Sequence, residues 1–221
     1  MGFIKTIADI IRSTVYPSSC AVCDRFEKNS VICRDCAIKL KHCAHRSFIN
    51  LYHANIAFTG YALYKYCYPE VRKIVIDMKR HNNDKLFDFC ANNIAELIKD
   101  TLRNYTDYTI VHIPTRKPAV AERGFDQARI LSEKLSKNLN IPYLPLLLRN
   151  GKSREQKNLN SAQRQDNVRG VFSINPRCMP AQNIILIDDV CTTGSTANEC
   201  IRVLKSAGCR NIACYFVSAV T

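Results

Sequence analysis

Hydrophobic residues follow two patterns that alternate along most of the chain. Short apolar runs predict buried strands, whereas apolar residues three and four positions apart predict helices. The expected strands, the first of which could be a hairpin, are 56–66, 109–114, 168–174, 183–188 and 211–220. The expected helices are 3–15, 71–83, 85–103, 125–140 and 195–208. This alternation predicts an α/β fold, a mostly parallel sheet flanked by helices.

Residues 20–45 break this pattern, because they are rich in cysteine and charge and too short to bury a core. Two Cys-x-x-Cys pairs supply four thiols: Cys20, Cys23, Cys33 and Cys36. Four thiolates at this spacing suit a tetrahedral, structural Zn²⁺ site. Cys43 or His45 could replace one ligand, and His45 could equally be a surface residue. We therefore expect an N-terminal helix and zinc module over 1–50, and the α/β domain over 51–221.

Seven other cysteines show no ligand spacing, and most of them fall in predicted helices or strands. We expect them to be core thiols, with Cys191 filling space in its loop because no base is evident nearby. These seven are Cys67, Cys90, Cys178, Cys191, Cys200, Cys209 and Cys214.

Composition indicates where in the cell the 221-residue chain is expected to be and which class of partner it would bind. No apolar run approaches the ~20 residues of a spanning helix, and residues 1–16 do not read as a secretory signal. Reduced thiols and a cytoplasmic protein are expected, with peripheral contact at the inner face of the cytoplasmic membrane as the alternative. The formal net charge of +13 favours a polyanionic partner, although a soluble protein can also be simply basic.

The stretch ILIDDVCTTGST (185–196) places two acids at the end of a predicted strand, with a hydroxyl-rich turn before a helix. Backbone N–H groups at a helix N-terminus bind phosphate, and carboxylates accept hydrogen bonds from ribose hydroxyls. The stretch therefore predicts a ribose 5-phosphate site. The alternative is an N-capped strand–turn–helix with two solvated aspartates. The residues are Asp188, Asp189, Thr192, Thr193, Gly194, Ser195 and Thr196.

This stretch resembles the signature of type I phosphoribosyltransferases, which bind phosphoribosyl pyrophosphate (PRPP). VHIPTRKPAVAERGFDQA (111–128), LRNGKSREQKNLNSAQRQDNVRGVF (148–172) and the cysteine pairs resemble the ComF-type competence proteins. These are zinc-finger-bearing relatives of amidophosphoribosyltransferase, linked to DNA uptake in natural transformation. The resemblance runs from about Cys20 to the last expected strand.

By this resemblance, Asp188 and Asp189 would hold the ribose hydroxyls, and 192–196 would hold the 5-phosphate. Thr115, Arg116 and Lys117 would lie where the family binds pyrophosphate, which needs cations and usually Mg²⁺. Residues 112–170 hold 12 Lys/Arg against 5 Asp/Glu. The polar stretch 149–167 would form a hood over the ligand, or else a solvated loop. Four cations of this stretch are considered for that role: Arg149, Lys152, Arg154 and Lys157.

The resemblance implies a competence factor that binds PRPP and handles incoming single-stranded DNA in the cytosol. Partners would then include a helicase or other proteins of the competence machinery. The alternative is a metabolic phosphoribosyltransferase acting on a small nucleophile or nucleobase. Nothing in the sequence marks an acceptor pocket, so enzymatic transfer and binding without chemistry both stay open. A third reading is a zinc-dependent adaptor that binds neither ligand.

Aromatic residues interspersed with cations would suit single-stranded DNA, whose bases stack and whose phosphates pair with cations. The alternative for the tyrosines is half-buried packing on a strand. The residues in question are Tyr61, Tyr64, Lys65, Tyr66, Tyr68, Arg72, Lys73, Lys79 and Arg80.

Overall fold

The computed structural model describes residues 19–44, 48–53, 56–150 and 170–220. The expected helix 3–15, His45 and most of the expected hood lie outside these residues. The described helices are α2 (Arg34–His42), α3 (Pro69–Arg80), α4 (Asp84–Thr101), α5 (Lys117–Arg123), α6 (Gln127–Leu139) and α8 (Ser195–Ser206). A short 3-10 helix spans Tyr105–Asp107.

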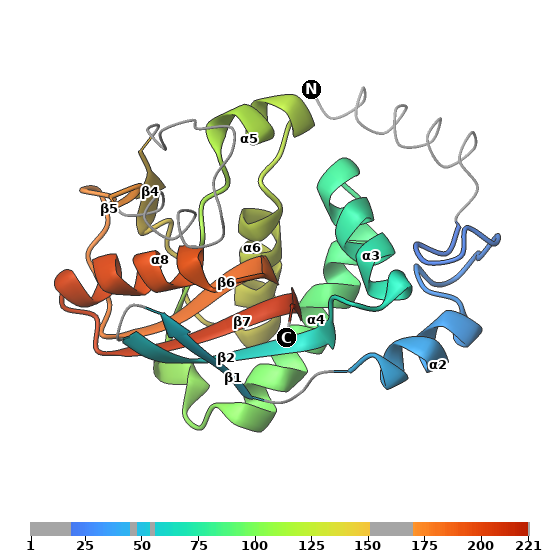
Figure 1. Cartoon of the computed structure of the whole chain (residues 1–221), viewed down its shortest axis with the longest axis horizontal. Coiled ribbons are helices and arrows are strands. Elements are labelled where there is room, and N and C mark those ends of the chain that lie inside the picture. The colour runs from blue at the N-terminus through green and yellow to red at the C-terminus, as the bar shows by residue number, and fades with distance from the viewer. Residues whose placement is uncertain (1–18, 45–47, 54–55, 151–169, 221) are drawn as a thin grey trace.

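Five strands form the central sheet, in the order β1-β2-β7-β6-β3 (Figure 1). Only β1 is antiparallel to its neighbour, so the prediction of a mostly parallel sheet is confirmed. The strands are β1 (Phe48–His53), β2 (Ile56–Lys65), β3 (Thr109–His112), β6 (Asn183–Cys191) and β7 (Asn211–Ala219). A separate antiparallel pair joins β4 (Leu147–Arg149) to β5 (Phe172–Ile174).

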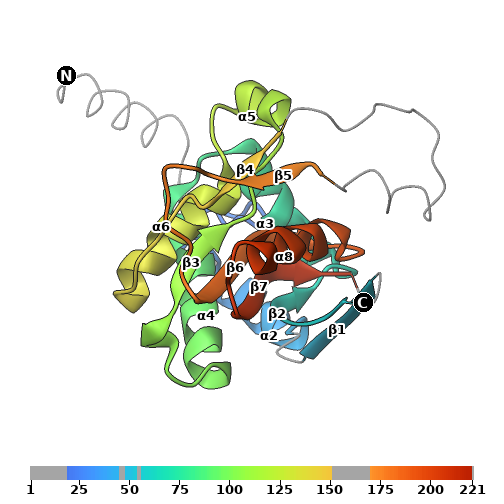
Figure 2. The ribbon, with the colours of Figure 1, turned by 90° about the vertical axis from the view of Figure 1, so that its left-hand side faces the viewer.

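Helices cover both faces of the sheet, as the apolar runs of the central strands require. Helices α3, α4 and α6 pack on one face, and α8 with the β4–β5 pair packs on the other (Figure 2). In β6, Ile185 and Ile187 belong to the first core, whereas Ile184 and Leu186 belong to the second. By the same alternation, Asp188 is on the side of the second core and Asp189 on the side of the first.

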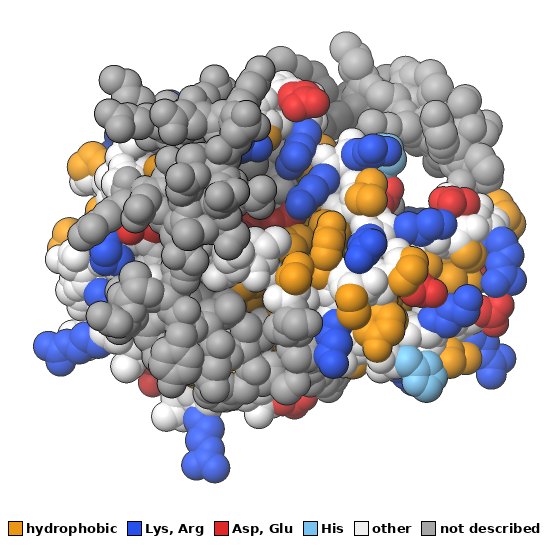
Figure 3. Space-filling view, in the orientation of Figure 1, with side chains coloured by type: hydrophobic (Ala, Val, Ile, Leu, Met, Phe, Trp, Pro, Cys, Tyr) orange, Lys and Arg blue, Asp and Glu red, His pale blue; other side chains and the backbone are white. Residues whose placement is uncertain are grey.

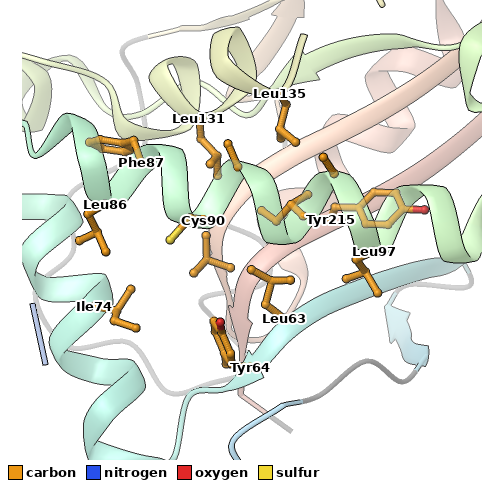
Figure 4. Packing of buried hydrophobic residues seen from close by; sticks show 14 of the residues in the cluster. Leu63, Tyr64, Ile74, Leu86, Phe87, Cys90, Leu97, Leu131, Leu135 and Tyr215 are labelled. Carbon is orange, nitrogen blue, oxygen red and sulfur yellow. The ribbon is translucent and has the colours of Figure 1, made fainter. Parts of the chain in front are cut away.

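The first core centres on α4, whose buried side chains meet neighbours from four other elements. Figure 4 shows Phe87 and Cys90 of α4 near Leu131 of α6 and Ile74 of α3. The Cys90 thiol lies 3.7 Å from the Met78 sulfur, and burial raises the pKa of this thiol to about 12. Cys90 is therefore a core thiol.

The described residues 19–44, which we call the cysteine module, pack directly against this same core. Val22, Ile32 and Leu40 are buried in the cluster that contains Val71 and Ile74 of α3. A backbone hydrogen bond from the Lys65 N–H to the Cys43 carbonyl also joins the module to the end of β2. The module therefore supports α3 from the side away from α4.

Five described elements were not expected from the sequence, namely α2, β1, the 3-10 helix, α5 and β4. Strand β4 has three residues and α5 has seven, so neither is long enough to show a clear period. Strand β6 also extends to Cys191, three residues beyond its expected end. Asp188 and Asp189 consequently lie inside the strand and not at its end. Within the described part of the expected strand 168–174, residues 170–174, the strand spans Phe172–Ile174.

Candidate functional site

The turn between β6 and α8, where the sequence predicts a phosphate site, lines a small recess. Gly194 has φ +73° and is the N-cap of α8, a conformation that favours glycine. Thr193 Oγ1 and Ser195 Oγ lie 2.7 Å apart. The recess has a volume of about 30 Å³ and is lined by Asp188, Val190, Cys191, Thr192, Gly194, Ser195, Thr196, Ala197 and Phe216.

Asp188 points into this recess on the α8 side of the sheet. Desolvation, together with the neighbouring Asp189 carboxylate, raises the pKa of Asp188 well above its usual range. An acid in this state is held in an environment that disfavours its charge until a partner arrives. A ligand that donates hydrogen bonds or brings a cation would relieve that cost.

Asp189 points to the opposite side of β6, where α3 and α6 lie. Its Oδ2 lies 3.4 Å from Lys79 Nζ and 3.4 Å from Gln127 Nε2. Arg123 Nη1 in turn lies 3.4 Å from Gln127 Oε1. The side chains of these two adjacent acids therefore lie on opposite faces of the sheet, near the end of β6. The sequence pattern does not reveal this arrangement.

An open hollow of about 420 Å³ lies beside Lys79, between α3 and α5. Its lining residues are Ile76, Lys79, Arg80, Glu122 and Arg123. Three of these five are cations, so the hollow suits an anionic group. Because Lys79 also contacts Asp189, the hollow and the end of β6 share a residue.

The segment after β3 carries the expected pyrophosphate residues and is fixed by one carboxylate. Asp126 Oδ2 accepts a hydrogen bond of 3.0 Å from the Thr115 N–H, and its Oδ1 accepts one of 3.0 Å from Thr115 Oγ1. Asp126 also caps α6 by accepting from the Ala128 and Arg129 N–H groups. Arg116 and Lys117 follow at the start of α5, and both are exposed.

Arg149, expected in the hood, lies at the end of β4. Its guanidinium lies 5.0 Å from the Phe172 ring centre, and its Nη1 lies 3.4 Å from the Pro114 carbonyl oxygen. Burial, then the nearby Arg116, lowers the pKa of Arg149, whereas Asp188 opposes that shift. Arg149 therefore stands between the 115–117 segment and the β6 recess. Lys152, Arg154 and Lys157 lie outside the described residues.

The four cysteines of the two pairs come together as the spacing predicts. Their sulfur atoms all lie within 4.8 Å of one another, and the Cys23 and Cys33 sulfurs are 3.7 Å apart. The Arg25 backbone N–H lowers the pKa of Cys23 to about 6. Cys20, Cys23, Cys33 and Cys36 could therefore hold a metal ion such as Zn²⁺. Cys43 is not part of this group, and its thiol donates to the Lys39 carbonyl.

Most of the remaining cysteines are buried, as expected. Cys90, Cys191, Cys200, Cys209 and Cys214 are core residues, whereas Cys67 is exposed and Cys178 is half-buried. Burial raises the pKa of Cys191 to about 12, which suits a space-filling thiol and not a nucleophile.

The tyrosines expected beside cations divide into two groups. Tyr64 is buried, and Tyr61 stacks on Tyr215 with ring centres 5.3 Å apart, so packing explains both. Tyr68 is exposed, and Tyr66 lies beneath the Arg72 guanidinium at 5.7 Å. Of the second group, Tyr68 is exposed and Tyr66 is half-buried, as Tyr61 is.

Four residues at the site were not singled out from the sequence: Arg123, Asp126 and Gln127, and Lys79 in its contact with Asp189. Three of these belong to ERGFDQ, whose Gly124 ends α5 with φ +82°. The sharp turn places Asp126 and Gln127 at the start of α6, where Asp126 contacts Thr115 and Gln127 contacts β6. A glycine between two short helical segments was the available signal.

Comparison with known proteins gives a matching family model and relatives with related sequences. Residues 82–220 match the family model of the phosphoribosyl transferase domain. The chain is 30% identical over 152 residues to competence protein F of Haemophilus influenzae, covering 66% of each chain. It is 30% identical over 128 residues to competence protein ComFC of Streptococcus pneumoniae, covering 57% of this chain and 54% of that protein.

The matched segment thus spans less than two thirds of the length of both relatives. Among solved structures, adenine phosphoribosyltransferase from Thermoanaerobacter pseudethanolicus aligns with a TM-score of 0.43 and 12% identity. That alignment covers 83% of this chain and 87% of the other.

Proposed function

This chain belongs to the phosphoribosyl transferase domain family, in its ComF-type competence group, and we propose that it is a cytosolic competence factor that binds PRPP with Mg²⁺ and handles incoming single-stranded DNA. Its curated relatives are named competence proteins, which supports the competence role. The single observation that carries the PRPP proposal is the recess formed by Asp188 and the turn that begins α8.

The recess suits the sugar and 5-phosphate of PRPP. The turn presents backbone N–H groups at the start of a 12-residue helix, together with the hydroxyls of Thr193 and Ser195. Asp188 would accept hydrogen bonds from the ribose hydroxyls, and Asp189 stands next to it for the same sugar or for Mg²⁺. The phosphate is a small, compact group, so the recess need only open slightly to admit it.

The pyrophosphate would lie between the recess and the 115–117 segment. Arg116, Lys117 and Arg149 bring three cations to this side of the sheet, and Asp126 holds Thr115 in place. Asp188 or Asp189 would hold Mg²⁺ beside the pyrophosphate, and the ion would neutralise part of its negative charge, a role that Mg²⁺ commonly has with substrate phosphates. The cations of this chain would then neutralise the remaining charge.

No helix in the described part of the chain is long and apolar enough to cross a membrane.

Contact with single-stranded DNA is supported by the net charge of +13 and by the basic side chains that gather on the face around α3 (Figure 3). The metal site would fix the module that supports α3, so its proposed role is structural. A helicase or another protein of the competence machinery is the proposed protein partner.

Equilibrium dialysis of labelled PRPP tests the proposal on metal-loaded, full-length protein with Mg²⁺. Binding should be saturable for the unmodified protein and for Lys205→Gln, whose residue is exposed on α8. It should fall at least tenfold for Asp188→Asn and Ser195→Asp, because the second change puts an anion where the phosphate would lie. Equal binding by all four proteins would overturn the PRPP assignment.

The same labelled PRPP separates binding from transfer. Incubation with nucleobases, ammonia or oligonucleotides should leave PRPP intact if the site only binds its ligand. Nucleobase-dependent release of pyrophosphate would instead support the metabolic phosphoribosyltransferase. Transformation frequency in cells that carry the Asp188→Asn allele then tests whether PRPP binding matters for competence.

A further inference from the structure

Helix α3 exposes a row of cations along the side that faces away from the core. Its buried residues, Val71, Ile74, Val75 and Met78, are all apolar. The opposite side carries the set that we call the α3 stripe: Arg72, Lys73, Ile76, Lys79 and Arg80. The residues recur three or four positions apart, so they share one face of the helix.

The first end of the α3 stripe carries exposed aromatic surface. The Arg72 guanidinium lies 5.7 Å from the Tyr66 ring centre, and its Nε donates to the Tyr66 carbonyl over 3.2 Å. Tyr68, the N-cap of α3, is 36% exposed. A planar guanidinium stacked on a ring, with a second ring nearby, offers flat surfaces on which unpaired bases stack.

The other end of the α3 stripe opens into the hollow between α3 and α5. There Arg123 joins Lys79 and Arg80, and Glu122 is the single acid among the lining residues. Ile76, which is 43% exposed, gives the hollow one apolar wall. Cations beside an apolar wall suit a nucleotide, whose phosphate is charged and whose base is not.

Three of the acidic groups near the α3 stripe lie beside a basic partner. Asp24 of the cysteine module lies 3.6 Å from Lys73 Nζ, and Asp77 lies 2.6 Å from His81 Nδ1. Asp189 lies 3.4 Å from Lys79. Arg72 and Arg80 form no ion pair within the described residues, so their charges are available to an anion.

We propose that incoming single-stranded DNA binds along the α3 stripe, and that one of its nucleotides enters the hollow beside Asp189. This inference rests on the proposed handling of single-stranded DNA and adds the surface and the direction. A 12-residue helix is about 18 Å long at ~1.5 Å per residue, which matches roughly five stacked nucleotides at ~3.4 Å each. The strand would thus run from the cysteine module toward the proposed PRPP site.

Fluorescence anisotropy with a labelled 20-nucleotide oligothymidylate tests this on metal-loaded, full-length protein. The test variant is Arg72→Gln with Arg80→Gln. The matched control is Lys137→Gln with Lys205→Gln, which removes the same charge from exposed positions on α6 and α8. The test variant should bind roughly tenfold more weakly than the control at low salt. Its slope of log K against log salt should be smaller by about 1.4, which is ~0.7 for each lost phosphate contact.

Photocrosslinking gives a readout that does not depend on a substitution. An oligonucleotide carrying 5-iodouracil should form adducts in the peptide 66–80 of the unmodified protein. Equal affinity of the two double variants, or adducts only outside 66–80 and the lining of the hollow, would overturn the placement and leave DNA handling itself intact. If the unmodified protein does not bind the oligonucleotide, both the placement and DNA handling fail, and PRPP binding stands as a separate matter.

Discussion

Lys79 Nζ lies 3.4 Å from Oδ2 of Asp189, and this contact ties the exposed face of α3 to the carboxylate near the end of β6. Asp189 is almost fully buried, whereas Lys79 is about one third exposed. The lysine therefore balances the charge of a buried acid while it also lines the hollow. The proposed PRPP site and the proposed DNA surface meet at this pair.

Replacing Lys79 by methionine should destabilise the protein, because the buried Asp189 carboxylate would lose the positive charge that lies 3.4 Å from its Oδ2. The expected loss in the free energy of unfolding is about 1–2 kcal/mol, between the values typical of exposed and buried pairs. Urea denaturation of the single and double variants with Asp189→Asn measures the coupling. Strictly additive effects would show that the pair contributes no interaction energy.

Replacing Asp188 by asparagine should stabilise the protein at neutral pH while it abolishes PRPP binding. Because the pKa of Asp188 is raised in the folded state, the folded protein binds this proton more tightly than the unfolded chain does. Stability from this group is then present at low pH and is lost as pH rises from the unfolded pKa through the raised folded pKa.

Thermal denaturation between pH 5 and 8 checks this expectation. Asp188→Asn should melt a few degrees above the unmodified protein at pH 7, with a flatter dependence on pH. A lower melting temperature of Asp188→Asn throughout this range would contradict this expectation. It would show that the Asp188 carboxylate stabilises the fold.

Replacing Asp126 by asparagine should weaken PRPP binding with little effect on folding. The side-chain oxygen of asparagine can still cap α6, but its NH₂ group cannot accept the Thr115 N–H. We expect a stability change below ~1 kcal/mol and roughly a tenfold loss of PRPP affinity. Ribose 5-phosphate, which lacks pyrophosphate, should bind equally to both proteins in a competition assay. An equal loss for both ligands would place Asp126 outside the pyrophosphate side.

The sequence supported the order of strands and helices because the apolar runs in 183–188 and 211–220 are long and clear. It also identified the four clustered thiols, since a Cys-x-x-Cys spacing is a local signal. It did not show that Asp188 and Asp189 point to opposite sides, because that depends on β6 continuing to Cys191. It also could not show that Lys79 reaches β6, since 110 residues separate this lysine from Asp189 along the chain.

The short elements were missed for a related reason. Helix α5 has no apolar stripe, and none of its residues is buried. It ends at Gly124, which is its C-cap residue. Tyr64 and Tyr68 lie four residues apart in the sequence. The same two alternatives, contact with single-stranded DNA or half-buried packing, were expected for both. Packing against the core decides that the first is buried and the second is exposed.

Metal removal should affect the whole protein and not only its first fifty residues. Cys36 is buried, and the module shares a hydrophobic cluster with α3 and α4. Cys36→Ser should therefore lose about one equivalent of zinc and lower the melting temperature of a single transition. Metal analysis with calorimetry measures both quantities, and Cys67→Ser at an exposed position is the control. Less than one equivalent of zinc in reconstituted unmodified protein would contradict the site.

The most direct measurement is isothermal titration calorimetry of full-length, metal-loaded protein with PRPP and Mg²⁺. The account predicts a saturable heat with one ligand per chain, which is lost in Asp188→Asn and retained in Lys205→Gln. Absence of heat in the folded, unmodified protein, or an unchanged isotherm after Asp188→Asn, would contradict the assignment of the β6–α8 turn as a sugar-phosphate site.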